Sequence, residues 1–319
     1  MVEQAAAAYR SFAAATHVKQ GWYVVARSSS LRAGTIKATN VGPRRVLVYR
    51  DLDGRAHVAS DRCPHLGSDL VRGRVTASGL RCAFHGWCWG PDGACTAAPG
   101  NPSIPPRRLR QYTADERWGF VWAWLGSAPG FPLPEVPASV TCRRALLPQR
   151  VRAHPDTTFA NGFDLAHFGA SHAIDVAANS LDVHPPWQIS HRIEGRLPRR
   201  PRFVVAGLGG MLLDATFTQY GGGIVYVHVR QPVENVIVFT IRPDERGHSR
   251  TQTILFVRRR RHMVRALALL WATALDDIPL MESIKWTRGF AGSDAVLERY
   301  VEFIEAMPAW QADPAGRGV

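Results

Sequence analysis

Two short segments, CPHLG at residues 63–67 and CAFHGW at residues 82–87, decide how this sequence is interpreted. Each supplies one cysteine and one histidine: Cys63 with His65, and Cys82 with His85. Glycine in both segments is typical of tight loops, in which backbone amides approach the sulfur atoms. The four side chains therefore predict one metal site that is assembled from two loops.

The order of the ligands separates two kinds of metal site. Zinc fingers group their ligands as pairs of cysteines and pairs of histidines, whereas here each loop contributes one of each type. Two such loops suit a [2Fe–2S] cluster in which two cysteines bind one iron and two histidines bind the other. The remaining cysteines have no such context: Cys88 and Cys95 are expected to be packing residues close to the cluster loops, and nothing in the sequence singles out Cys142.

The composition is that of an ordinary globular protein with a strong positive charge. Among 319 residues, 46% are hydrophobic and the net charge is +13. This length suggests two domains. No apolar run is long enough to span a bilayer, and the N-terminal residues do not resemble a signal peptide. We therefore expect a cytoplasmic protein without a membrane partner.

The arginine-rich charge fits an acidic protein partner or a nucleic acid. The basic runs, such as residues 258–261, are short and are not interleaved with stacking aromatics. We therefore expect no nucleic-acid partner.

Strand and turn signals dominate the first part of the chain. We expect strands at residues 22–27, 45–50, 56–60 and 118–124, a turn at 51–54, and a proline-rich boundary at 129–137. Beyond it we expect a helix at 157–171, strands at 212–220, 223–231, 233–241 and 251–257, and helices at 262–288 and 294–307. This block order predicts an α+β class. We expect an all-β domain at 20–135, and a domain formed by 1–19 and 136–319 with an antiparallel sheet flanked by helices.

A second group of metal-binding residue types lies in NGFDLAHFGASH, residues 161–172. Asn161, Asp164 and His167 recur at helical spacing, which predicts that they share one helix face. His172 follows His167 by five residues, so on a regular helix its side chain would point away from that face. The helix must therefore end or distort near Gly169 for both imidazoles to reach one ion.

Two histidines need one carboxylate to complete the ligand set of a non-haem Fe(II) site. Asp276 and Asp277 both lie in the helix expected at 262–288, where Pro279 would cause a kink. Asp277 shares its face with apolar residues, and a carboxylate on a buried face needs a partner such as a metal ion. We therefore expect Asp277 to be the ligand, with Asp276 as the alternative.

Together these motifs resemble those of the Rieske non-haem iron oxygenases. CPHLG and CAFHGW look like the two cluster-binding boxes of that family, and D-x-x-H-x₄-H resembles its catalytic iron motif. The segments WYVVAR and DIPLMES look similar to those of the monooxygenase-type members. The resemblance covers most of the chain.

The resemblance implies cofactors, partners and roles for the residues. It implies a [2Fe–2S] cluster on Cys63, His65, Cys82 and His85, and a mononuclear Fe(II) on His167, His172 and Asp277. A ferredoxin or an NAD(P)H reductase would supply electrons, which pass between neighbouring subunits of a head-to-tail homotrimer. Asp164 matches the aspartate that joins the two sites across the subunit boundary. Asn161 would be a second candidate catalytic residue, near the iron but not a strong ligand.

The implied reaction is an O₂-dependent oxidation of a small organic molecule by hydroxylation, N-oxygenation, desaturation or demethylation. No charged anchor for a substrate stands out, so an aromatic or apolar substrate is expected. Candidate pocket residues are the aromatics Phe163, Phe203, Phe217, Tyr226, Phe239 and Trp286. Two alternatives stay open: a Rieske electron carrier without catalysis, and a zinc-stabilised nucleic-acid-binding protein.

Overall fold

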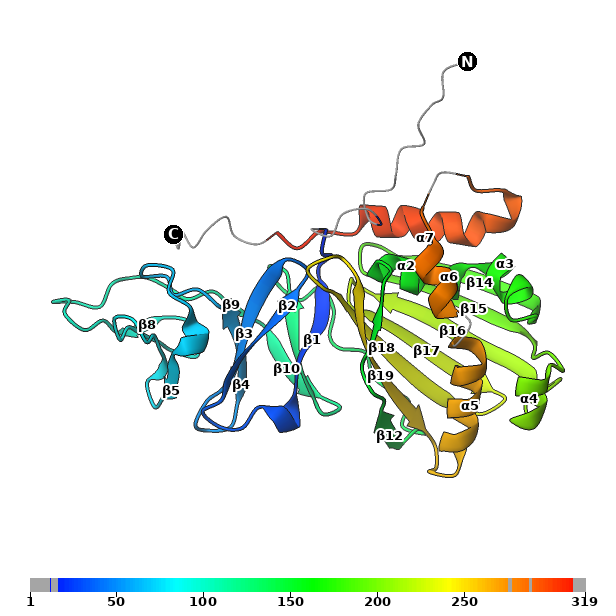
Figure 1. The fold of residues 1–319 in the computed structure, drawn as a ribbon, viewed down its shortest axis with the longest axis horizontal. Coiled ribbons are helices and arrows are strands. Elements are labelled where there is room, and N and C mark those ends of the chain that lie inside the picture. Colours follow the sequence, from blue (N-terminus) through cyan, green and yellow to red (C-terminus); the bar gives the residue numbers. More distant parts are fainter. Residues whose placement is uncertain (1–11, 13–16, 275–276, 287–288, 312–319) are drawn as a thin grey trace, which may run out of the picture. The chain divides into compact units, whose positions relative to one another are not determined.

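The computed structural model describes residues 12, 17–274, 277–286 and 289–311 (Figure 1). The described residues form two compact units. One consists of residues 20–130 and 309–311, and the other of the described residues in 1–19 and 131–308. The change from one unit to the other at Gly130 falls inside the proline-rich stretch 129–137.

The first unit is built from three small antiparallel sheets. In the first sheet the strands lie in the order β1 (Gly21–Arg27), β11 (Phe120–Leu125) and β10 (Ala114–Arg117). In the second sheet the order is β2 (Ile36–Val41), β3 (Arg44–Arg50), β4 (Ala56–Ser60) and β9 (Gln111–Tyr112). In the third it is β5 (Arg74–Thr76), β6 (Gly79–Arg81), β7 (Cys88–Trp89) and β8 (Cys95–Ala97). Two 3₁₀ turns, η1 (Ser28–Ser30) and η2 (Leu70–Arg72), complete it. The CPHLG segment thus lies between β4 and η2, and CAFHGW between β6 and β7.

One strand of this unit starts later than the sequence predicts. The expected strand at 118–124 is β11, but Trp118 and Gly119 form the turn between β10 and β11 and have φ angles of 59° and 85°. Positive φ at both central residues is the geometry that joins two antiparallel strands most tightly. The indole of Trp118 packs edge-on against Trp122, with ring centroids 5.8 Å apart.

The second unit is dominated by one 8-stranded antiparallel sheet. Its strand order is β12 (Cys142–Ala145), β19 (Ser249–Val257), β18 (Asn235–Pro243), β17 (Ile224–Gln231), β16 (Leu212–Tyr220), β15 (Gln188–Arg196) and β14 (Asp175–His184), and β13 (Gln149–Val151) also pairs with β19. The helical elements are α2 (Pro155–Ala160), η3 (Asn161–Phe163), α3 (Leu165–Ala170), α4 (Pro201–Val205), α5 (His262–Ala274), α6 (Asp277–Ser283), η4 (Gly292–Asp294) and α7 (Ala295–Ala306).

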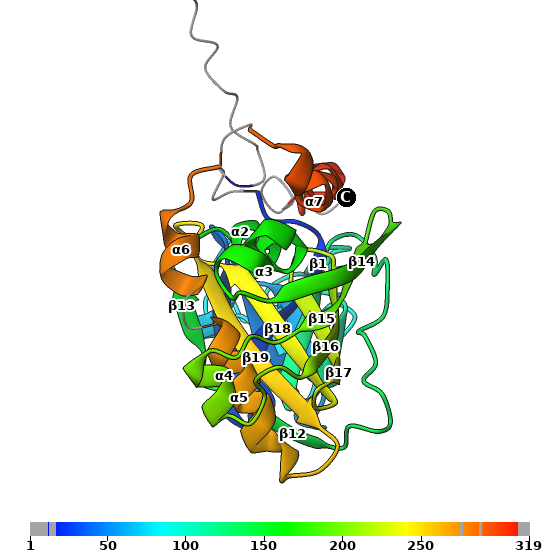
Figure 2. The same ribbon diagram turned by 90° about the vertical axis from the view of Figure 1, so that its right-hand side faces the viewer.

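The helices cover one face of this sheet, as Figure 2 shows for α2, α3, α5 and α6. The main core lies between them and contains alternate residues of the strands, such as Val225, Val227 and Val229 of β17. Successive residues of a strand point to opposite faces of the sheet, so these three valines share one face. The expected α+β class, with an all-β part and a sheet flanked by helices, is confirmed.

Two predicted helices are divided in the structure. The helix expected at 157–171 consists of α2, η3 and α3, with Asp164 in an extended conformation between the last two. The helix expected at 262–288 is described as α5 and α6, and α6 ends at Ser283. Pro279 is the third residue of α6, where a missing amide hydrogen costs nothing. The alternative ligand Asp276 lies outside the described residues.

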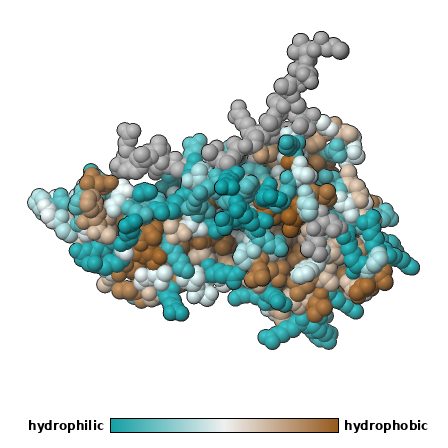
Figure 3. Space-filling view, in the orientation of Figure 1, coloured by the Kyte–Doolittle hydropathy of each residue, from teal (hydrophilic) through white to brown (hydrophobic). Residues whose placement is uncertain are grey.

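None of the helices in the described part of the chain is both long and apolar enough to cross a membrane. Figure 3 shows hydrophobic patches scattered among hydrophilic ones on the face in view.

Candidate metal centres

The two cluster motifs form loops with matching backbone hydrogen bonds. In the first loop the amide of Gly67 donates to the carbonyl of Cys63 at 2.8 Å, and in the second the amide of Gly86 donates to that of Cys82 at 3.1 Å. Both glycines have positive φ angles, 74° and 72°, which explains the residue type at these positions. The chain therefore presents two turns of the same shape, each with one cysteine at its start.

The four candidate cluster ligands divide into a buried and an accessible pair. Cys63 and Cys82 are buried, with 2% and 3% of their surface exposed. The rings of His65 and His85 lie closer to solvent, with centroids 4.8 Å apart. Burial raises the pKa of the Cys63 thiol to about 11. A thiolate at this position needs a bound cation, so the donor set and its surroundings fit an iron–sulfur cluster.

Neighbouring arginines fix the first loop. Arg107 Nη1 donates to the carbonyl oxygens of Pro64 and His65, both at 3.0 Å. Arg45 forms ion pairs of 2.7 Å with Asp61 and with Asp69, which stand on either side of the loop. These contacts hold the loop from both its ends and its tip.

The second candidate centre brings together three residues from two parts of the chain. His167 lies in α3, His172 follows that helix, and Asp277 opens α6. The Nε2 atoms of the two histidines are 3.0 Å apart, and Asp277 Oδ1 lies 3.2 Å from His167 Nε2 and 3.1 Å from His172 Nε2. The three ligand atoms therefore converge on one point.

The spacing of these atoms is a test of whether a metal ion fits. Two ligands at right angles, each about 2.1 Å from one ion, are about 3.0 Å apart, close to the distances observed. Within the described residues, Asp277 Oδ1 and His172 Nδ1 are buried without a hydrogen-bond partner. A buried carboxylate oxygen that contacts two imidazoles without hydrogen-bonding geometry is what a shared cation would satisfy. The residues fit a mononuclear ion.

The charge state of the carboxylate agrees with this fit. Burial acts to raise the pKa of Asp277, but the adjacent His167 and His172 outweigh it and lower that pKa to about 2. Asp277 is therefore ionised at neutral pH. Ser171 Oγ lies 3.1 Å from His167 Nδ1 and orients the ring so that Nε2 points toward Asp277.

Asp164 and Asn161 occupy different positions from those expected on a single helix face. Asp164 has φ −104° and ψ 97°, and its Oδ1 accepts a hydrogen bond of 2.9 Å from the amide of His167. It is the N-cap of α3, so the shared face predicted for Asn161, Asp164 and His167 is wrong. The helix ends at Ala170, one residue beyond Gly169, and Ala173 takes a positive φ of 52°.

Two contacts that the sequence does not reveal position the segment that carries the histidines. His191 of β15 is fully buried, and its Nδ1 lies 2.8 Å from the carbonyl of Gly162. Burial lowers the pKa of His191, so the neutral ring donates this hydrogen bond. Phe163 is stacked on Tyr300 of α7, with centroids 4.5 Å apart.

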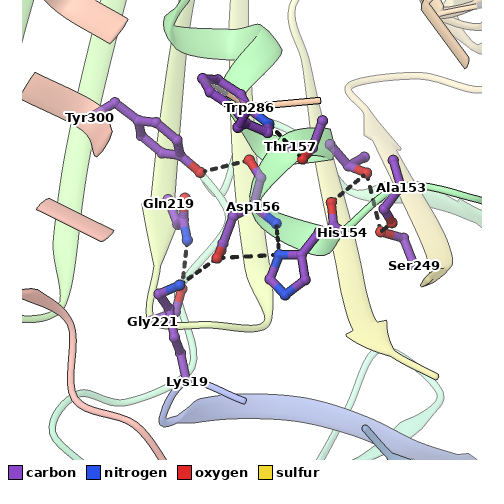
Figure 4. Close-up of polar contacts among 11 residues, drawn as sticks. Lys19, Ala153, His154, Asp156, Thr157, Gln219, Gly221, Ser249, Trp286 and Tyr300 are labelled. Carbon is purple, nitrogen blue, oxygen red and sulfur yellow. Dashed lines mark hydrogen bonds and ion pairs between the residues drawn. The ribbon is translucent and has the colours of Figure 1, made fainter. Parts of the chain in front are cut away.

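A buried ion pair anchors the start of α2 (Figure 4). Lys19 and Asp156 are 3% and 2% exposed, and their charged atoms are in direct contact. The amide of Asp156 donates to His154 Nδ1 at 3.2 Å, and its carbonyl accepts from the hydroxyl of Tyr300 at 3.2 Å. The segment that leads to Asn161 is thus fixed by side chains from well-separated parts of the sequence.

An apolar cavity of ≈ 200 Å³ opens onto the candidate iron ligands. His167, His172, Asp277 and Asn161 line it together with the helix-facing side of the sheet. Of the six aromatics named from the sequence, Phe217 and Phe239 line the cavity. The other four do not belong to its lining: Phe163, Phe203, Tyr226 and Trp286. They have packing contacts instead, such as that of Phe203, which is completely buried in the core. Sequence alone also missed Gln149, Thr251 and Thr253, which carry no charge or motif.

The comparisons with known proteins agree with this geometry. Residues 21–113 match the family model of the Rieske [2Fe-2S] domain. Over 226 residues, 66% of this chain and 60% of the relative, the sequence is 31% identical to aminopyrrolnitrin oxygenase PrnD of Pseudomonas fluorescens. It is 30% identical to the 3-chlorobenzoate-3,4-dioxygenase oxygenase subunit of Comamonas testosteroni over 53% of this chain and 41% of that one. The chain thus spans less than two thirds of these relatives.

Solved structures show the same fold. Dicamba monooxygenase bound to dicamba aligns with a TM-score of 0.68 at 17% identity, over 91% of this chain and 98% of that one. NdmA of Pseudomonas putida CBB5 aligns with a TM-score of 0.62 at 17% identity, over 92% and 97%. The chain therefore contains a Rieske [2Fe-2S] domain, is similar in sequence to these two oxygenases, and shares the fold of dicamba monooxygenase.

Proposed function

We propose that the chain is the oxygenase component of a Rieske-type system, which uses O₂ and supplied electrons to oxidise a small aromatic or apolar molecule. One observation carries the proposal. His167, His172 and Asp277 converge within 3.2 Å of one another at an apolar cavity, in a chain that also contains a Rieske domain. An electron carrier has no use for this second group.

The proposed roles follow from the two sites. Cys63, His65, Cys82 and His85 would hold the cluster, and His167, His172 and Asp277 would hold the iron. When bound, the cluster supplies single electrons and the iron ion supplies the site of O₂ activation. Ser171 and the buried ion pair keep the ligands oriented, and the apolar wall excludes water from the reacting atoms.

The two units correspond in this proposal to two domains. The Rieske domain would occupy 20–135, and the catalytic domain 1–19 and 136–319. We also propose that an NAD(P)H reductase or a ferredoxin delivers the electrons, and that the protein works in the cytoplasm.

Exposed apolar side chains beside the cluster ligands support a homotrimer. Leu66 and Phe84, which neighbour His65 and His85, are 67% and 64% exposed. Large apolar side chains at a surface favour burial against another protein. Asp164 would then join the two kinds of site across the subunit boundary, and Asn161 would assist near the iron.

Iron content and substrate oxidation test the proposal. The oxygenase should bind about three Fe per chain and an electron carrier about two. With NADH and a surrogate reductase, a library of small aromatic amines, phenols and hydrocarbons should yield at least one oxidised product that depends on O₂. A red-brown protein with two Fe and no product would instead support the carrier. The zinc alternative is not supported, because the matching domain model is that of a [2Fe–2S] protein.

A further inference from the structure

Two threonines stand side by side in the wall of the cavity. Thr251 and Thr253 of β19 are 8% and 7% exposed, and both line the cavity. They are two residues apart on one strand, so their side chains project from the same face of the sheet. Within the described part of the chain, neither hydroxyl forms a hydrogen bond.

The other threonines of the cavity behave differently. Thr158 Oγ1 lies 3.2 Å from Ser249 Oγ and donates to the carbonyl of His154 at 3.4 Å. Thr273 Oγ1 donates within its own helix, to the carbonyls of Leu269 and Leu270. Thr251 and Thr253 thus differ from their neighbours in having hydroxyl groups left for a ligand.

The neighbours of the two threonines on β18 are apolar, whereas on the other side Thr251 pairs with Gln149 of β13. Across the sheet Thr253 pairs with Phe239 and Thr251 with Ile241, and both partners line the cavity too. Neither hydroxyl oxygen is among the described polar atoms that are fully buried without a partner, so both can be reached from the cavity. An aliphatic residue would pack better at either position. A hydrogen bond to a polar atom of a ligand would explain why both residues are threonine.

The charges around the cavity restrict that ligand further. Among the described residues that line it, the only ionisable side chains are His167, His172 and Asp277. No arginine or lysine lines the cavity in the part of the chain that the structure describes, despite the net charge of +13. A carboxylate substrate would find no counter-ion there, and burying its charge alone would be costly.

We infer that the substrate is a neutral molecule with an apolar body and one hydrogen-bonding group, such as a hydroxyl, carbonyl or amide, that binds Thr251 and Thr253. This inference rests on the proposed function, because it assigns the cavity to the substrate. The two threonines are specificity-determining residues that set the orientation of the substrate relative to His167, His172 and Asp277.

Binding of three naphthalene derivatives to the full chain tests the inference. 2-Naphthol carries a neutral hydroxyl, 2-methylnaphthalene replaces it with a methyl group, and 2-naphthoate carries a charge. We expect calorimetry to show the tightest binding for 2-naphthol and the weakest for 2-naphthoate. Thr251→Val and Thr253→Val should together weaken 2-naphthol binding by about fivefold or more, the equivalent of one net hydrogen bond, and leave 2-methylnaphthalene unaffected.

Two further variants separate recognition from folding. Thr253→Ser keeps a hydroxyl and should keep the preference for 2-naphthol. Thr240→Val removes a buried hydroxyl from β18 that does not line the cavity, and should leave all three affinities unchanged. Equal affinity for 2-naphthol and 2-methylnaphthalene in the unaltered protein would overturn the inference. Binding requires neither electrons nor O₂, so an inactive protein that retains the preference would overturn only the oxygenase proposal.

Discussion

Asp277 is the residue on which the proposed iron site depends. Its Oδ1 contacts both histidines and lies within 3.2 Å of each Nε2 atom. Without the carboxylate, two imidazoles alone hold a divalent ion weakly. We expect Asp277→Ala to lower the iron content from about three to about two per chain and to abolish product formation, while the visible spectrum of the cluster stays intact.

The matched variant for this prediction is Asp276→Ala, which removes the neighbouring carboxylate. It should keep the iron content and the turnover of the unaltered protein. If Asp276→Ala lost the iron and Asp277→Ala kept it, the ligand assignment would be wrong.

Asp164 has a structural role in the fold and a proposed role in electron transfer, and two substitutions distinguish them. Its Oδ1 caps α3 by accepting from the amide of His167 at 2.9 Å. Asparagine caps helices about as well as aspartate, whereas loss of a cap costs about 1 kcal/mol. In chemical denaturation, Asp164→Asn should therefore unfold like the unaltered protein, and Asp164→Ala should be less stable by about 1 kcal/mol.

The effect of these substitutions on turnover should differ from their effect on stability. If the carboxylate joins two subunits as proposed, Asp164→Asn should lose most O₂-dependent oxidation while it retains stability and both metal contents. A fully active Asp164→Asn would leave the residue with its capping role alone.

At the scale of single elements, the buried pair Lys19 and Asp156 determines how firmly α2 is held (Figure 4). Removal of one member of a buried ion pair leaves an unpaired charge and costs about 3–5 kcal/mol. Replacement of both members by apolar residues is often much less harmful. We expect Lys19→Met to destabilise the protein by about that amount in urea unfolding, and Lys19→Met with Asp156→Leu to recover much of it.

The exposed pair Arg299 and Glu302 supplies the control, because its members are 63% and 56% exposed. Exposed ion pairs contribute about 0–1 kcal/mol, so Arg299→Met should be nearly neutral. Equal losses for Lys19→Met and Arg299→Met would show that the buried pair does not hold α2.

The sequence predicts strands best where turn-forming residues bound a short run of strand-forming residues. The strands β3, β4 and β16 lie within one residue of their predicted bounds, because turn-forming residues bound each of these short runs. The strand β14 was missed because it is an edge strand with mostly exposed polar residues, which carry no alternation. Helical spacing likewise predicts one helix through Asp164. The sequence does not reveal the break there, because a residue that caps the next helix can fall at the same spacing as a residue inside a helix.

The candidate sites could be predicted where the type and spacing of residues indicate a particular kind of metal site. The cluster motifs and the pair His167 and His172 could be located from their patterns alone. Asp277 required a choice between neighbouring carboxylates, and that choice remains a prediction until its variants are measured. Thr251 and Thr253 could not be found, because only the pairing of β19 with β18 and the packing of the helices above them create the cavity.

At the scale of the whole molecule, the proposed homotrimer requires that each active site be shared between two subunits. A closed cyclic trimer repeats one head-to-tail interface three times, so the cluster of one subunit would serve the iron of its neighbour. This arrangement makes a prediction that a self-sufficient monomer does not. Two inactive variants, one without the iron ligand and one without a cluster ligand, should restore activity to each other in mixed trimers.

Asp277→Ala and Cys82→Ser, each with a different affinity tag, provide this pair. After co-expression and purification through both tags, light scattering should show three chains of 35.2 kDa each. A functional junction needs an intact iron site in one subunit and an intact cluster in the preceding one. Each doubly tagged trimer contains both variants, so one of its three junctions, about a third, is active. Turnover should therefore reach about a third of that of the unaltered protein.

The control is Asp277→Ala co-expressed with itself under both tags, which should stay inactive because no subunit holds the iron. Iron and cluster analysis of the mixed trimers must show that the intact site of each variant is loaded. Doubly tagged trimers with loaded sites and no turnover would mean that electrons do not cross between subunits. In that case Asp164 would lose its proposed role in joining the two sites, while the iron ligands would keep theirs.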